Sequence, residues 1–126
     1  MAAPNIVNVT SILGKTAYLS PVTTNSTAVL QNAASSNKVL KINTILAANI
    51  DGTNASDITV FITTVSGGVT AIFHLAASIT VPADSSLVIT SKDTSFYLEE
   101  DRQIKAVASS SNDLSLMISY EELDDA

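Results

Sequence analysis

The chain has 126 residues, which suits one domain with a substantial core and is marginal for two. Its net charge of −6 disfavours binding to the phosphates of a nucleic acid or to an anionic membrane surface. Cysteine is absent, which excludes disulfides and thiolate metal sites. Every apolar run is shorter than the ~20 residues of a membrane span, and the first residues lack the features of a secretory signal.

Charged residues make up only 14% of the chain and hydrophobic residues 46%. The remainder is mainly Ser, Thr and Asn instead of the Lys and Glu of a typical soluble surface. This composition indicates that part of the outer surface meets other protein. The alternative is a Ser- and Thr-rich sheet that faces water.

The first third of the chain predicts short strands separated by polar loops. Valines alternate with polar residues over 5–13, which predicts a first strand. A turn at Gly14 and a short return strand over 16–19 are expected next. The brief apolar run at 27–30 reads as a strand, although residues 28–34 could also form a turn or two of helix.

Residues 38–64 predict a long hairpin of central paired strands, 38–50 and 57–64, joined by a polar loop over 51–57. Apolar side chains recur at alternate positions in both runs, and alternate residues of a strand share one face. The first run is expected to bury Leu40, Ile42, Leu46, Ala48 and Ile50, and the second Ile58, Val60 and Ile62.

The second half of the chain continues the pattern of short strands and turns. Gly67-Gly68 predicts a tight hairpin turn. The strand after it is expected to place Val69, Ala71, Phe73, Leu75, Ala77 and Ile79 on one face. Pro82 ends that strand, because proline cannot donate to a sheet. Further strands are expected around 87–89, 96–99, 104–108 and 114–120.

About eight strands with no long amphipathic helix predict an all-β fold, an antiparallel β-sandwich of the jelly-roll type. The whole chain, residues 1–126, is predicted to form a single domain. A short N-terminal arm over 1–4 and an acidic C-terminal tail over 121–126 are expected to lie outside its core.

Residues for catalysis or metal binding are scarce. His74 is the one histidine, and no nucleophile motif accompanies it. The loop over 51–57 lacks the alternating oxygen ligands and the terminal Glu of a calcium loop. We therefore predict no catalytic residues, no metal and no cofactor, and a protein that is not an enzyme.

The aromatic residues divide between the predicted core and the predicted surface. Three share a face with aliphatic neighbours and are expected in the core: Phe73, Phe96 and Tyr120. Four side chains should project outward as candidate protein–protein contacts: Phe61, Ile72, His74 and Tyr97. The alternative is that a loop covers these outward residues.

A series of short segments carries a family resemblance. In chain order they are Asn5-Ile6-Val7-Asn8-Val9-Thr10, Asp51-Gly52-Thr53-Asn54-Ala55, Val81-Pro82-Ala83-Asp84, Leu87-Val88-Ile89, Lys92-Asp93-Thr94-Ser95, Tyr97-Leu98-Glu99-Glu100 and Ser119-Tyr120-Glu121-Glu122. Together they resemble small virion structural proteins of marine tailed bacteriophages, including those that infect cyanobacteria (cyanophages). The resemblance implies a β-sandwich subunit on the outside of a virion, in the head or the tail. It supplies no catalytic or binding residues.

The function expected from this resemblance is that of a capsid decoration or cement protein on the outside of a phage head. A tail or fibre-adaptor subunit and a host-surface carbohydrate-binding module are the alternatives. The expected partners are further copies of the chain, with a trimer as the guess, and virion proteins such as the major capsid protein. The protein would be made in the host cytoplasm and reside in the virion, without nucleic acid or membrane as a partner.

Overall fold

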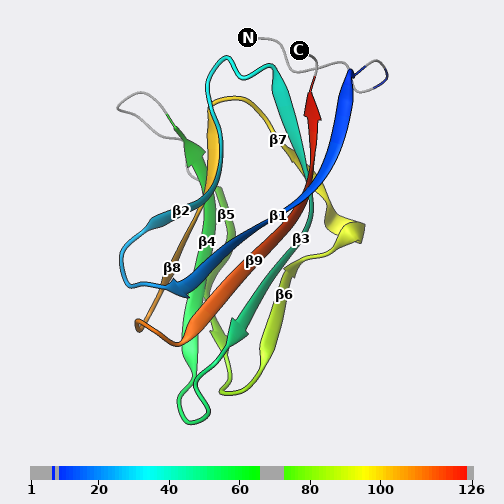
Figure 1. The fold of residues 1–126 in the computed structure, drawn as a ribbon. Coiled ribbons are helices and arrows are strands. Elements are labelled where there is room, and N and C mark those ends of the chain that lie inside the picture. Colours follow the sequence, from blue (N-terminus) through cyan, green and yellow to red (C-terminus); the bar gives the residue numbers. More distant parts are fainter. Residues whose placement is uncertain (1–6, 8, 66–72, 125–126) are drawn as a thin grey trace.

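Two antiparallel sheets pack face to face in the computed structural model, which describes residues 7, 9–65 and 73–124 (Figure 1). Sheet A contains β1 (Ser11–Val22), β9 (Leu114–Asp124), β3 (Lys38–Asn49), β6 (Ser86–Thr90) and β7 (Phe96–Leu98). Sheet B contains β2 (Thr27–Asn32), β8 (Arg102–Ala108), β4 (Ser56–Thr64) and β5 (Phe73–Val81). The one helical element among these residues is the short 3-10 helix η1 (Lys92–Thr94), and no helix there is long or apolar enough to cross a membrane.

The pairing of the strands is that of a jelly roll. The chain behaves as one long hairpin in which β1 pairs with β9, β2 with β8, β3 with β6 and β7, and β4 with β5. Because β6 and β7 both pair with β3 and only η1 and its flanking residues separate them, they share one strand position. Eight positions result, in the orders β1-β9-β3-β6 and β2-β8-β4-β5. The predicted all-β sandwich of about eight strands is confirmed.

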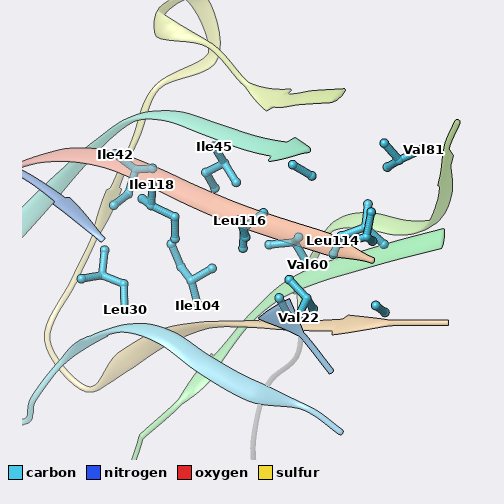
Figure 2. Close-up of a cluster of buried hydrophobic side chains, with 14 of the residues drawn as sticks. Val22, Leu30, Ile42, Ile45, Val60, Val81, Ile104, Leu114, Leu116 and Ile118 are labelled. Carbon is cyan, nitrogen blue, oxygen red and sulfur yellow. The ribbon is translucent and has the colours of Figure 1, made fainter. Parts of the chain in front are cut away.

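The core lies between the two sheets and is almost entirely aliphatic. Ile42 and Ile118 from sheet A approach Ile104 from sheet B across this space (Figure 2). All three side chains are fully buried. Burying such a side chain contributes on the order of 1.5–3 kcal/mol, so this layer supplies the main stabilisation of the fold.

A β-bulge in β3 changes which residues face the core. The register of β3 against β9 shifts between Ile42 and Thr44, and one extra residue exchanges the two faces of the strand. The prediction for this strand was correct for Leu40 and Ile42. It was wrong beyond the bulge, where the buried residues are Ile45, Ala47 and Asn49, while Leu46 and Ala48 are only partly buried and Ile50 is 61% exposed.

The predicted hairpin of strands 38–50 and 57–64 is also wrong. Both strands exist, but β3 belongs to sheet A and β4 to sheet B, so the loop between them crosses from one sheet to the other. Both edges of β3 are occupied, by β9 on one side and by β6 and β7 on the other. Alternation predicts that a strand has a buried face, but it does not predict the neighbour to which that strand is hydrogen-bonded.

Two further strands of sheet A, β1 and β9, also differ from the prediction. β1 runs straight through Gly14, which pairs with Glu121, so the expected turn and return strand are absent there. Residues 121–124, expected in an acidic tail, instead belong to β9 and pair with both β1 and β3. The Glu122 carboxylate lies 3.2 Å from Lys15 Nζ and 3.4 Å from Lys38 Nζ, so lysines from both flanking strands compensate its charge. The expected arm over 1–4 lies outside the described residues.

In sheet B, residues 27–32 form the strand β2, which resolves the choice between strand and helix. The alternation predicted for β5 breaks, because its register against β4 shifts twice. Phe73 was predicted to be buried and is 66% exposed, since β5 is an edge strand of the sheet. Val69 and Ala71 of the same predicted face lie outside the described residues. Phe96 and Tyr120, by contrast, pack against the core as expected.

Candidate functional site

The structure brings together two of the four predicted contact residues. Phe61 on β4 and His74 on β5 are directly opposite each other in sheet B, with ring centroids 5.6 Å apart and ring planes inclined by 40°. The neighbours of Phe61 in the chain, Val60 and Ile62, face the core, so this pair lies on the outer face of the sheet. Lys105 of β8 flanks Phe61 on its other side.

The other two predicted residues do not join this pair. Tyr97 is exposed on β7, opposite Lys41, and so belongs to sheet A on the other side of the sandwich. Ile72 lies outside the described residues. The four candidates therefore do not form one patch, and the Phe61–His74 pair is the part of the prediction that has a defined geometry.

The outer face of sheet A carries a larger apolar feature. A row of four side chains crosses β1, β9, β3 and β6, which lie side by side in Figure 1. Register places Tyr18 opposite Met117, Met117 opposite Leu46, and Leu46 opposite Val88. Tyr18 is 73% exposed and Val88 57% exposed, at the two ends of the row. We call these four residues the apolar ridge.

A hollow of ≈ 560 Å³ runs beside the apolar ridge on the same face. Its floor is the neighbouring cross-strand row of Thr16, Ser119 and Thr44, whose side chains are all small. Tyr18 forms one wall, and Lys92 contributes to the lining from η1. We call this row and the space above it the trough. Ridge and trough together form two adjacent rows in which no residue carries a charge.

The bulge in β3 creates this outer face. Because the register shifts between Ile42 and Thr44, Thr44 and Leu46 turn outward and Ile45 turns into the core. Asn43 at the bulge donates from Nδ2 to Glu121 Oε2 over 3.3 Å, which ties the bulge to β9. Without the extra residue, Leu46 would lie inside the sandwich, as simple alternation predicts.

Sequence reasoning did not select Tyr18, Met117, Leu46 or Val88. The turn expected at Gly14 placed Tyr18 in a short return strand, and the alternation in β3 placed Leu46 in the core. One usable signal was present, because Tyr18 alternates with Ala17 and Leu19, which pack against the core. The alignment of the four residues across four strands follows only from the strand registers.

The loops at the far end of the sandwich contain acidic and amide side chains that bond to one another. Asp51 accepts hydrogen bonds from the backbone N–H of Thr53 (2.8 Å) and from Nδ2 of Asn54 (3.3 Å). These bonds, the first of them above all, lower the pKa of Asp51 below its ordinary value. Within residues 7, 9–65 and 73–124, no group of three or more His, Asp or Glu side chains is placed to hold a metal ion.

We therefore expect the stability of the protein to be independent of metal. Thermal melts of the full chain, with and without a chelator, should coincide. The Asp51 loop gains its order from its own hydrogen bonds, and a cation is not needed to hold it. A substantial fall in melting temperature on chelation, restored by adding back one divalent metal, would contradict this prediction.

No protein-family model matches the chain, and no curated protein matches it. Among solved structures, the chain is similar to a protein of Bacillus endospore appendages, which form a family of disulfide-linked pili. That match has 13% sequence identity, covers 92% of this chain and 90% of the other, and has a TM-score of 0.46. At this level it carries no argument about function.

Proposed function

We propose that this chain is a non-enzymatic structural protein of a virion that binds the outside of a phage head as a decoration or cement protein. The observation that carries the proposal is the pair of adjacent uncharged rows on the outer face of sheet A, where the apolar ridge spans four strands. Exposed apolar residues arranged in a continuous row are typical of a surface that meets another protein. A solvated sheet would be expected to carry charges at these positions.

Three further features support the proposal. The segments quoted above resemble virion proteins of marine tailed phages. The jelly roll is an architecture that viral capsid domains share with lectins and cupins, so it is compatible with the role without specifying it. Sheet B adds a second, separate apolar contact through Phe61 and His74. A decoration protein needs two such surfaces if it binds both the shell and its neighbours.

The number of copies per particle tests the placement. A decoration protein should approach the number of major capsid subunits in purified particles, because it covers the whole shell. A tail or fibre adaptor should be present in a few dozen copies at most. Quantitative mass spectrometry against labelled standards measures this ratio. Absence of the protein from purified particles would contradict the virion assignment itself.

Replacing Phe61 with lysine tests whether the outer face of sheet B takes part in attachment. The residue lies on the outer face and already neighbours Lys105, so the variant should keep the circular dichroism and melting temperature of the wild type. Loss of one well-packed aromatic anchor should reduce incorporation into particles by about tenfold. Ala77→Lys, at an exposed position on β5, is the matched control and should be incorporated normally. Equal incorporation of both variants would exclude this face from attachment.

A further inference from the structure

The geometry of sheet A points to a partner for its outer face. We propose that two copies of the chain associate face to face through sheet A, with the apolar ridge of each copy seated in the trough of the other. The inference deepens the structural role proposed above and rests on it for its biological context. The registers of four strands align the residues of this face into rows. The shape of these rows indicates that a second copy binds there and how it is oriented.

The ridge and the trough are complementary in shape and lie next to each other. The ridge is a row of larger side chains, Tyr18, Met117, Leu46 and Val88, and the parallel row that floors the trough is Thr16, Ser119 and Thr44. A two-fold axis that runs between the two rows, in the plane of the contact, places each ridge over the trough of the other copy. Such an interface is self-complementary, which is the property required of a symmetric dimer.

The end of the rows at β1 also agrees with this arrangement. The axis keeps each residue at its own strand position, so Tyr18 of the second copy lies over Thr16 of the first, beside Gly14. Among residues 7, 9–65 and 73–124, apart from Gly14 and its chain neighbours, no atom lies within 4 Å of the point where a Cβ of Gly14 would be, so this end of the trough has room for an aromatic ring. The strands of the two copies then run antiparallel to each other, within the aligned class of sheet packing.

The flanking rows supply a polar rim. On the ridge side the row is Ser115, Ala48 and Ser86, and on the trough side it includes Gly14, Glu121 and Lys41. The same axis brings the serine row of one copy opposite the charged row of the other. At the strand positions that the axis keeps, Ser115 lies over Glu121 and its hydroxyl can donate to that carboxylate. Ala48 lies over Lys41, whose long side chain can extend past it into water.

The area of the contact is sufficient for a specific but modest dimer. Four strands spaced by about 4.8 Å and four rows spaced by about 6.8 Å give a footprint of about 500 Å² on each copy. The total of about 1,000 Å² lies at the lower limit of specific interfaces, so we expect a weak, reversible dimer. A partner of another kind could bind the apolar ridge without a complementary trough beside it. A symmetric dimer requires a ridge and a complementary trough on the same face, and sheet A has both.

Sedimentation equilibrium of the full chain tests the proposal. Wild-type protein should show a reversible monomer–dimer equilibrium at micromolar concentrations. Tyr18→Lys should raise the dissociation constant by at least about 100-fold, because each dimer loses the residue twice. Val88→Lys, on the opposite edge of the sheet, should act in the same direction. Phe73→Lys removes a comparably exposed aromatic from sheet B and should leave the equilibrium unchanged.

A trough-filling variant distinguishes this geometry from general hydrophobic attraction. Ser119→Phe adds apolar surface to the face but occupies the space into which the ridge of the other copy fits. The proposal expects weaker association than the wild type. Stronger association of Ser119→Phe, or wild-type protein that remains monomeric up to about 1 mM, would overturn it.

These experiments distinguish a failure of the proposed dimer from a failure of the proposed function. A monomeric protein that is nevertheless abundant in purified particles would overturn the dimer and leave the decoration role standing. A dimer with the expected response to Tyr18→Lys and Ser119→Phe, absent from particles, would overturn the role and leave the interface standing.

Discussion

Ile42→Asp is expected to abolish folding. The side chain is fully buried on β3, where it packs in the aliphatic layer with Ile118 and faces sheet B. An unpaired carboxylate at this position would cost several kcal/mol, against a total stability of about 5–15 kcal/mol for a domain of this kind. Circular dichroism and the yield of soluble protein measure the effect.

Ile50→Asp is the matched control, because it makes the same change just after the same strand. Simple alternation from Leu40 places both isoleucines in the core, whereas the bulge at Asn43 leaves Ile50 61% exposed. The variant should therefore fold with little loss of stability. A folded Ile42→Asp variant would show that this face is not the core, and an unfolded Ile50→Asp variant would show that the register shift is incorrect.

Asn49→Ala is expected to destabilise the protein by about 2–3 kcal/mol, because it leaves buried backbone groups without partners. Asn49 is buried at the end of β3 and makes three bonds of 2.9 Å. Its Nδ2 donates to the carbonyl groups of Asn54 and Val81, and its Oδ1 accepts from the backbone N–H of Asp51. These bonds fix the loop that crosses from sheet A to sheet B and connect it to the end of β5.

Asn54→Ala provides the comparison for this site. Asn54 is exposed, and its side chain makes one weak bond of 3.3 Å to Asp51. The substitution should change the free energy of unfolding by well under 1 kcal/mol. Denaturant unfolding measures both variants. Equal effects of the two substitutions would mean that the buried Asn49 does not organise the crossing loop.

The class of fold could be predicted from the sequence because the relevant signals are local. Alternation and turn residues predicted strands close to β2, β4, β6, β7, β8 and β9 without knowledge of their partners. The buried face of β3 beyond Asn43 and the course of β1 through Gly14 could not be predicted. A bulge at Asn43 leaves apolar residues on both faces of β3, and Gly14 lies within a strand that the tertiary structure imposes.

The two candidate interaction surfaces also differ in whether they could be predicted from the sequence. Phe61 and His74 could be predicted to point outward, because each alternates with apolar neighbours in its own strand. The apolar ridge could not be predicted, since its four residues come from β1, β9, β3 and β6 and align only through three strand registers. Charge gave a partial indication, because the charged fraction of 14% is well below the roughly 25% that is usual in soluble domains.

The two proposals together describe how the molecule could assemble. Sheet A joins two copies through ridge and trough, while the Phe61–His74 pair on sheet B remains free for a second contact. The two surfaces lie on opposite sides of the sandwich, so both can be occupied at the same time. A subunit with this arrangement can link neighbouring sites on a larger shell.

Cross-linking of single-cysteine variants tests the central claim most directly, because the natural chain has no cysteine and each variant carries one thiol. Ser119→Cys lies in the trough, and Lys105→Cys lies on the outer face of sheet B. Face-to-face sheets are about 10 Å apart, so a short bis-maleimide should link Ser119→Cys chains into dimers and leave Lys105→Cys chains monomeric. Linkage of the Lys105→Cys chains without linkage of the Ser119→Cys chains would contradict an interface on sheet A.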